Sequence, residues 1–338
     1  MGVDLGDLFP KRPLALESLK GRTVAVDAHN VLYQFLSIIR QPDGTPLRDS
    51  QGRVTSHLSG LIYRTTNLVE AGVRPVFVFD GRPPPLKRAT LEARAALRQE
   101  AEVRWEAAAR AGDDEEAFRW AQASSRVTRD TVAESKGLLE AMGVATVQAP
   151  SEGEAQAAHM ARKGDAWAAV SQDFDSLLFG APRLVRNLAV TGRRKLPRRN
   201  LYVNVEPEEV VLEEGLGAHG ITREQLIALG VLVGTDFHPG IRGVGPKKAL
   251  KLVKEHGTLE KCLAALGQEI ENGRLIEEFF RNPDVADDYD LKPRAPRPDD
   301  ILRILCDEHD FSRERVEKAV ERLKEAAGAK AQKTLFQF

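Results

Sequence analysis

Four stretches of the sequence run apolar and end in acidic residues. The first two end at Asp27 and Asp80, the third leads into Glu152 and Glu154, and the fourth ends with Asp173 and Asp175. Short β-branched and aromatic runs with little polar alternation are typical of buried strands in a parallel sheet. Because ligands bind outside the carboxyl ends of such strands, we expect these six carboxylates to meet at one edge of one sheet. Their mutual repulsion predicts cations between them, and an all-oxygen set favours Mg²⁺ or Mn²⁺ over zinc.

Simpler roles remain open for the individual acids. A single Asp after a strand often forms a turn or caps a helix, and Ser151 with Glu154 matches a helix capping box. Asp173 and Asp175 are harder to explain in this way, because in an extended chain both would point to the same face. Such a pair suits two metal ions about 3.5–4 Å apart. Together the four strand ends predict a multi-metal phosphodiesterase.

The elements that would position these acids can be placed from the same patterns. The expected strands span 23–27, 76–80, 145–147 and 168–175, and the expected helices include 31–39, 56–71 and 226–234. Between the second and third strands, residues 86–110 have a strong helix composition, and a second helix follows to about residue 124. Lys87 and Arg94 lie seven residues apart and would share one face of this polar hairpin. An ordinary helical hairpin with solvated charges is the alternative.

A glycine-rich turn follows the last of these helices. Residues 239–249 contain Gly240, Gly243 and Gly245, with Pro246 at the expected first helical turn. Exposed N–H groups and a helix N-terminus can bind a phosphate, and they would contact the nucleic-acid backbone rather than read bases. A plain connection between two helices is the alternative.

The charge distribution is more informative than the total. The chain has 338 residues and a formal net charge of −1, from 49 basic and 50 acidic residues. However, residues 177–205 contain seven Lys and Arg and no acid, and the stretch between Asp236 and Glu255 is also basic and free of acids. Basic surface beside an acidic metal cluster indicates an enzyme that binds and cuts a polyanion, although either stretch alone could be a solvated face.

Cysteine usage and hydropathy indicate the cellular compartment of the protein. The two cysteines, Cys262 and Cys306, are too far apart in sequence for a metal-ligand pair motif and give no disulfide framework, which fits a reducing compartment. No apolar stretch reaches the length of a membrane span, and the first residues lack the pattern of a signal peptide. We therefore expect a cytoplasmic protein.

Six motifs, taken together, resemble those of a known family over nearly the whole chain. They cover residues 26–28, 78–81, 150–155, 172–175, 234–236 and 243–247, and they stand in the order found in flap endonucleases of the structure-specific 5′ nuclease superfamily, most like the archaeal type. The resemblance implies an α/β fold: a PIN-like nuclease core with a mainly parallel sheet, a helical arch and a helix-hairpin-helix type DNA-binding element. It also implies cleavage near the base of a DNA 5′ flap by two-metal catalysis, with 5′-3′ exonuclease activity.

The resemblance assigns roles residue by residue. It makes Asp236 the seventh carboxylate, places Asp80, Glu152 and Glu154 about one Mg²⁺ with Asp27 acting through water, and places Asp173, Asp175 and Asp236 about another. Lys87 and Arg94 would act at the scissile phosphate. The implied DNA contacts are Tyr33, Arg40, Arg64, Glu152, Gly234, Asp236, Gly243, Gly245, Lys247 and Lys248, and the glycine hairpin would also bind K⁺.

The last residues resemble the peptide that binds a sliding clamp (PCNA). Gln332, Leu335 and Phe338 fall at positions 0, +3 and +6, and a short 3₁₀-like turn would place the last two on one side. Because residues 326–331 are small and Gly328 weakens a helix, this segment is expected to fray into a tether. A frayed end without a partner is the alternative.

The resulting organisation has five parts. They are an N-terminal nuclease region at 1–98, an arch or intermediate segment at 99–135, an internal nuclease region at 136–258, a C-terminal helical region at 259–325 and a clamp-binding tail at 326–338. We expect a monomer that binds 5′-flap DNA and no membrane. The alternatives are a Holliday-junction or bubble-cutting relative and, from another class, a non-catalytic clamp-bound DNA-binding protein.

Overall fold

A seven-stranded sheet forms the centre of the structure, a computed structural model that describes residues 2–41, 43–190, 192–195 and 202–335. The strand order is β1-β9-β6-β5-β2-β3-β4, and the five strands from β6 to β4 are parallel. β9 pairs antiparallel with β6, and β1 pairs antiparallel with β9. Their bounds are β1 Arg12–Pro13, β2 Thr23–Asp27, β3 Arg74–Phe79, β4 Ala145–Gln148, β5 Ala168–Val170, β6 Arg183–Arg186 and β9 Glu208–Val211. A separate antiparallel pair joins β7 Gly192–Lys195 to β8 Tyr202–Val205. The predicted α/β fold with a mainly parallel sheet is confirmed.

The central strands are apolar on both faces because helices cover both. Val24, Ala25 and Val26 of β2 are almost completely buried, and Ala25 lies opposite Val76 of β3 on one side and Ala169 of β5 on the other. Such a strand has no solvent-facing side, which explains its lack of polar alternation.

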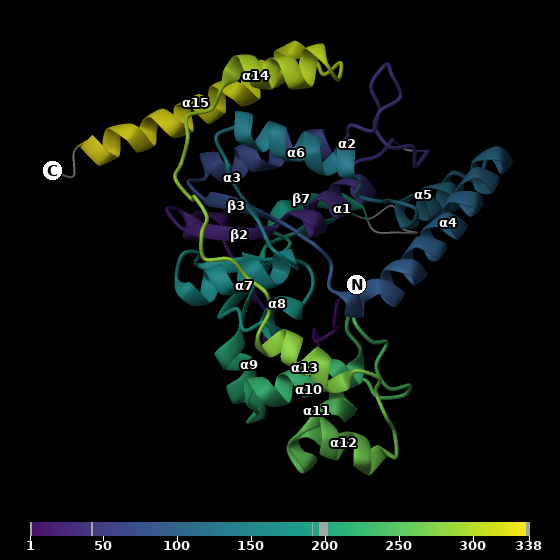
Figure 1. Cartoon of the computed structure of the whole chain (residues 1–338). Coiled ribbons are helices and arrows are strands. Elements are labelled where there is room, and N and C mark those ends of the chain that lie inside the picture. Colours follow the sequence, from purple (N-terminus) through teal and green to yellow (C-terminus); the bar gives the residue numbers. More distant parts are fainter. Residues whose placement is uncertain (1, 42, 191, 196–201, 336–338) are drawn as a thin grey trace.

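Two hydrophobic clusters lie on the two faces of the sheet. The helical segments of one face are α1 Ala28–Ile38, α2 Ser56–Gly60, a π-helical turn at Leu61–Thr65, α3 Thr66–Glu70, α6 Arg129–Ala141, α14 Pro298–Leu302, a π-helical turn at Arg303–Asp307 and α15 Arg313–Leu335. Those of the other face are α7 Gly153–Lys163, α8 Asp175–Leu178, α9 Leu212–His219, α10 Arg223–Val233, α11 Pro246–His256, α12 Leu259–Leu266 and α13 Gly273–Arg281. Figure 1 shows the first group above the sheet and the second below it.

A helical hairpin projects from the side of this body (Figure 1). It consists of α4 Arg88–Ala111 and α5 Asp114–Ala123. Gly112 ends α4 in the left-handed conformation, with φ +73°, and Asp113 caps α5 by accepting a hydrogen bond from the N–H of Glu116. The expected hairpin is present, and the boundary proposed at residue 99 falls inside α4.

Two sequence expectations about local structure are wrong. The strand expected at 168–175 ends at Val170, because the Ser171 hydroxyl accepts a hydrogen bond from the N–H of Asp173 and turns the chain before α8. Asp173 and Asp175 therefore do not share a face of an extended segment. Residues 326–331 do not fray but continue α15 as far as Leu335. Alanine is the best helix former, so the four alanines there outweigh the roughly 1 kcal/mol cost of Gly328.

Phe338, the last residue of the expected clamp-binding peptide, lies outside the described residues. Among the helices of the described ranges, none combines the length and the apolar character needed to cross a membrane.

Candidate active site

Seven acidic side chains meet at the carboxyl edge of the parallel strands. Asp27 is the last residue of β2, Asp80 follows β3 and Asp173 follows β5. Glu152 and Glu154 stand at the start of α7, just after β4, while Asp175 begins α8 and Asp236 follows α10. Because β5, β2, β3 and β4 are neighbours in the sheet, their ends bring these acids together from positions far apart in the sequence.

The acids repel one another in a buried environment. The pKa of Asp27 is raised well above its usual range by burial and then by the charge of Asp80. Burial followed by repulsion from Asp175 and Asp27 raises the pKa of Glu154 in the same way. The pKa of Asp175 rises to about 7, again mainly because of burial, with Asp236 and Asp173 adding to it. A nearby cation would relieve this repulsion.

Two cations from the base of the helical hairpin already face the cluster. Lys87 forms an ion pair with Glu152, and its Nζ lies 3.4 Å from Oδ2 of Asp236. Arg94 binds both carboxylate oxygens of Asp236. Burial raises the pKa of Asp236, but Lys87 and Arg94 outweigh it, and the pKa is lowered overall. The expectation that Lys87 and Arg94 share one face is confirmed.

The chemistry of the cluster fits divalent metal ions, although its geometry is open. Every member is a carboxylate, and hard oxygen ligands suit Mg²⁺ and Mn²⁺. Within the described residues, no three Asp, Glu, His or Cys side chains converge closely enough to hold one ion. Glu152 and Asp236 are instead drawn towards Lys87 and Arg94. The ligand types therefore fit these metals. To coordinate them, Glu152 and Asp236 must exchange their contacts with Lys87 and Arg94 for contacts with a metal ion.

Polar residues that the sequence interpretation missed hold the acids in place. Asn30 donates from its backbone to Asp27 over 3.0 Å and from Nδ2 to Asp173 over 3.2 Å. The Ser171 hydroxyl donates to Oε1 of Glu154 over 2.6 Å. A signal for Asn30 did exist: it stands three residues after Asp27, where a backbone N–H of the first helical turn donates to a capping carboxylate.

These contacts settle the alternatives left open for single acids. Asp27 does cap α1, since its side chain accepts the Asn30 N–H, and it belongs to the acidic cluster as well. The capping box of Ser151 and Glu154 is wrong, because Glu152 is the cap residue of α7 and its side chain makes no capping hydrogen bond. Glu154 is instead oriented by Ser171.

Two glycines allow the backbone to approach the acids closely. The N–H of Gly153 donates to Oδ1 of Asp80 over 2.7 Å, and a Cβ at Gly153 would lie 2.8 Å from that oxygen. The N–H of Val3 donates to Oδ1 of Asp175 over 2.7 Å. A Cβ at Gly2 would lie 2.7 Å from Oδ2 of the same carboxylate. Any side chain larger than hydrogen would displace these acids.

Three of the expected DNA contacts differ in their surroundings. Tyr33, on α1, is 38% exposed and free to stack. Arg64 lies in the π-helical turn at Leu61–Thr65 and is half-buried. Arg40, in contrast, donates to Leu36, Gly44 and Ser125 of the protein itself.

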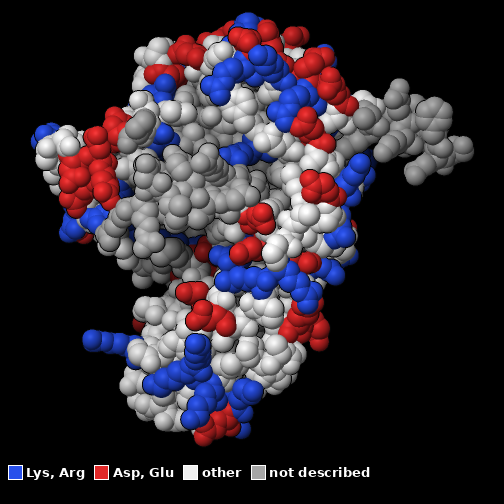
Figure 2. Space-filling model, turned by 180° about the vertical axis from the view of Figure 1, so that it is seen from behind, with Lys and Arg blue, Asp and Glu red and all other residues white. Residues whose placement is uncertain are grey.

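The glycine hairpin is built as its sequence indicates. Gly234 ends α10 with φ +119°, and a Cβ there would lie 2.7 Å from the carbonyl oxygen of Pro239. Gly243 has φ +80°, and Gly245 precedes Pro246 at the start of α11. Lys247 and Lys248 are exposed on this helix. Lys and Arg side chains gather at the lower end of the molecule in Figure 2, where Figure 1 places α10 to α13.

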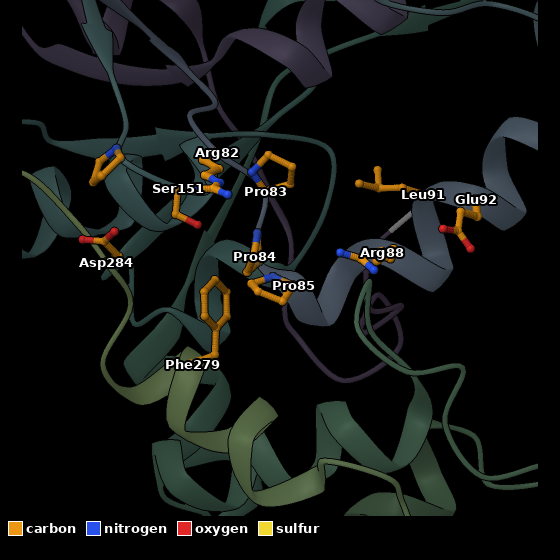
Figure 3. A pocket seen from close by; sticks show the side chains of 11 residues that line it. Arg82, Pro83, Pro84, Pro85, Arg88, Leu91, Glu92, Ser151, Phe279 and Asp284 are labelled. Carbon is orange, nitrogen blue, oxygen red and sulfur yellow. The ribbon is translucent and has the colours of Figure 1, made fainter.

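A cavity of about 840 Å³ lies beside the cluster, between the start of α4 and α13 (Figure 3). It is lined by Arg82, the prolines at 83–85, Arg88, Leu91, Glu92, Pro150, Ser151, Phe279 and Asp284. None of the seven clustered acids is among these residues.

Comparison with known proteins agrees with this geometry. The XPG N-terminal domain matches residues 7–101, and the XPG I-region matches residues 143–236. The chain is 58% identical over 323 residues to flap endonuclease 1 of Methanothrix thermoacetophila, covering 96% of each protein. The chain belongs to the flap endonuclease family. As a member of that family it is a nuclease.

Solved structures of this family and its relatives share the fold. Flap endonuclease-1 from Methanococcus jannaschii matches with a TM-score of 0.78 and 41% identity, over 97% of this chain and 100% of that one. The catalytic core of Rad2 in complex with DNA substrate matches with a TM-score of 0.69 and 25% identity, over 96% and 100% of the two chains. The PIN-like nuclease core that the sequence predicts is thus confirmed.

Proposed function

We propose that this protein is a structure-specific 5′ flap endonuclease that hydrolyses a DNA phosphodiester near the base of the flap, in replication and repair. The observation that carries the proposal is the meeting of seven acids at the carboxyl ends of neighbouring parallel strands, opposite Lys87 and Arg94 of the helical hairpin. The names of its flap endonuclease relatives support the choice of substrate.

The acids would hold two divalent metals, with Mg²⁺ as the first choice and Mn²⁺ as a substitute. Asp80, Glu152 and Glu154 would bind one of them with Asp27 acting through water, and Asp173, Asp175 and Asp236 would bind the other. When bound, such metals activate water, stabilise the leaving oxygen and neutralise charge on the phosphate.

Lys87 and Arg94 would clamp the scissile phosphate. In the structure their charges are balanced by Glu152 and Asp236. Once metals balance those carboxylates, the ammonium and the guanidinium can turn to the phosphate, where they would stabilise the charge that develops in the transition state. The exposed ring of Tyr33 would stack on a neighbouring base.

The surrounding residues would bind the rest of the substrate. The backbone of Gly243 and Gly245, the exposed Lys247 and Lys248 and a K⁺ ion at the hairpin would hold duplex phosphates. Gly234 and the acids Glu152 and Asp236 would approach the DNA beside the metals, and Arg64 would contact its backbone. The hairpin of α4 and α5 would form the arch under which a 5′ flap passes.

The C-terminal residues would attach the enzyme to a sliding clamp. Gln332, Leu335 and Phe338 carry the spacing of such a peptide. We further propose that the protein acts as a monomer in the cytoplasm and that it has 5′-3′ exonuclease activity in addition.

The test is a comparison of labelled substrates. A 5′-flap duplex, a blunt duplex and a four-way junction are each incubated with the protein and Mg²⁺. We expect cleavage near the base of the flap and little reaction on the other two. Preferred cleavage of the four-way junction would support a junction-resolving enzyme instead, and binding of flap DNA without any cleavage would support a non-catalytic DNA-binding protein.

A further inference from the structure

Arg40 connects three parts of the chain: the end of α1, the loop that follows it and the residues after α5. It follows α1, and its Nε donates to the carbonyl oxygen of Leu36 over 2.8 Å. Its two terminal nitrogens donate to the carbonyl oxygen of Gly44 over 2.7 Å and to Oγ of Ser125 over 2.8 Å. A guanidinium has five N–H groups, and at least three of those of Arg40 are thus used within the protein.

Other contacts strengthen the same junction between α1 and the end of α5. Gln122 donates from Nε2 to the carbonyl oxygen of Ser37 over 3.1 Å. Ser125 is 4% exposed, and it accepts from Arg40 while its hydroxyl lies 3.5 Å from the carbonyl oxygen of Leu36. Gly44 has φ +83°, and a Cβ there would lie 2.7 Å from Cα of Phe118. Backbone packs on backbone at this point, which leaves little freedom for α5 to shift.

The junction leads directly to the active site along α1. The N-terminal end of this helix carries the cap residue Asp27 and Asn30, which donates to Asp173. The first leg of the arch, α4, reaches the same acids through Lys87 and Arg94. The arch is therefore attached to the catalytic centre at both of its feet, directly at α4 and through α1 at α5.

We propose that Arg40 is a positioning residue: it fastens the α5 foot of the arch to α1 and so fixes the arch relative to the acids. The proposal rests on the proposed flap endonuclease function. It gives Arg40 a structural role, which differs from direct contact with a DNA phosphate. Burial lowers the pKa of Arg40 to about 10, as expected for a guanidinium enclosed in such a junction.

The experiment compares three variants of the full-length protein. Arg40→Lys keeps the positive charge but cannot make the three directed bonds. Ser125→Ala removes the acceptor at α5 without changing any charge. Arg48→Lys is the matched control, because Arg48 is exposed and its Nη1 donates to the carbonyl oxygen of Gly52 in its own loop.

Hydrogen exchange without DNA reports on the junction itself. We expect amides of residues 114–123 to exchange about tenfold faster in Arg40→Lys and Ser125→Ala, because each loses the hydrogen bond between the guanidinium and the hydroxyl. The double variant should exchange little faster than either single one, since both changes break the same bond. Arg48→Lys should exchange like the unmodified protein.

DNA binding and single-turnover cleavage separate positioning from phosphate contact. We expect both variants to cleave a flap about tenfold more slowly, while the dependence of log K on log salt keeps its slope. If Arg40 acted only as a phosphate contact, Arg40→Lys would keep both the slope and nearly the unmodified cleavage rate, because its charge remains, and Ser125→Ala would be unaffected.

That second pattern, together with unchanged exchange in residues 114–123, would overturn the proposal. If the unmodified protein fails to cleave flap DNA, the proposed function is wrong, but exchange still decides whether Arg40 fastens the arch foot.

Discussion

At the scale of single residues, the buried acids of the cluster repel one another, and a bound cation would relieve this repulsion. Asp27 and Asp175 are almost completely buried, and the pKa of each is raised first by burial and then by neighbouring acids. Proteins seldom bury like charges unless a bound ion compensates them. Asn30 and Ser171 direct the carboxylates by donating to them, which prepares their oxygens for such an ion.

Replacing one acid tests whether the cluster holds metals. Asp173→Ala is expected to reduce flap cleavage by more than about 100-fold at saturating Mg²⁺, because even residues behind metal ligands cost 10–100-fold when removed. Binding of flap DNA should change little, since the basic surface remains. Asp288→Ala, at an exposed acid in the linker before α14, serves as the control. Normal turnover by Asp173→Ala would contradict the two-metal assignment.

The close approach at Gly2 leads to a second residue-scale prediction. Gly2→Ala would place a Cβ 2.7 Å from Oδ2 of Asp175, so the carboxylate must move. We expect cleavage to fall by about 10-fold or more with an unchanged melting temperature and unchanged DNA affinity. Gly21→Ala is a poor control because of its positive φ, whereas Gly217→Ala meets no atom within 4 Å. Cleavage by Gly2→Ala at the unmodified rate would show that Asp175 tolerates the displacement.

At the scale of elements, the sheet explains how much of the site could be predicted from the sequence. Four strand ends lead into acids, and their apolar runs were sufficient to predict that six carboxylates meet at one edge: Asp27, Asp80, Glu152, Glu154, Asp173 and Asp175. Asp236 follows a helix, so no strand pattern could assign it, and only the family resemblance did. The turn at Ser171 depends on a local side-chain hydrogen bond, which periodicity does not reveal.

Contacts between segments that are distant in the sequence could not be predicted from the sequence either. The bonds of Arg40 join Leu36, Gly44 and Ser125, and the last of these lies 85 positions away in the chain. The family resemblance assigned Arg40 to a DNA contact. Only the fold shows that its guanidinium also bonds to Ser125, just after the helical hairpin.

The base of the arch gives the element-scale prediction. Lys87→Ala and Arg94→Ala are each expected to lower single-turnover cleavage by about 100-fold while flap affinity falls only slightly, because the cations act on the reacting phosphate. Arg98→Ala, farther along α4, is the matched control on the same helix. Loss of affinity with no change in the single-turnover rate would instead make Lys87 and Arg94 ordinary phosphate contacts.

At the scale of the whole molecule, the buried carboxylate of Asp49 connects the N-terminal part of the chain to the C-terminal helical region. Asp49 accepts from Nδ1 of His309 over 2.9 Å and from the backbone and Nε of Arg53 over 2.8 and 2.7 Å. Burial raises the pKa of Asp49, but these donors outweigh it and lower the pKa to about 2. The C-terminal helical region is in this way fixed to the loop that precedes α2.

The lowered pKa of Asp49 predicts an acid-sensitive contribution to stability. Its folded pKa lies below the usual value of 3.8, so its stabilising effect is fully present above about pH 4 and is lost as the pH falls towards 2. The difference in unfolding free energy between the unmodified protein and Asp49→Asn should therefore shrink as the pH falls from about 4 to about 2 in urea titrations. A difference that stays constant over this range would contradict the assigned contacts.

The C-terminal end gives the last prediction, because α15 extends well beyond the body of the molecule (Figure 1). The helix runs from Arg313 to Leu335. Among its side chains that the structure describes, those buried in the core are Val316, Ala319, Val320 and Leu323, all in its first half. The segment that bears the clamp-binding spacing thus begins more than two helical turns after the last of these core residues.

Deleting residues from Gln332 onward should consequently leave the stability of the enzyme and its cleavage of a free flap unchanged, since these four core residues are retained. Stimulation by the matching sliding clamp should disappear, because a clamp pocket would lose the Leu335 and Phe338 anchors. The measurement is the cleavage rate of the full-length and truncated proteins with and without the clamp on the same flap DNA. Because the segment before Gln332 is helical, the bound peptide must either end α15 or unwind its last turn. The substitution Thr334→Gly should weaken the helix there without removing an anchor. In the deletion experiment, equal stimulation of the full-length and truncated proteins by the clamp would show that the tail has no role at the clamp.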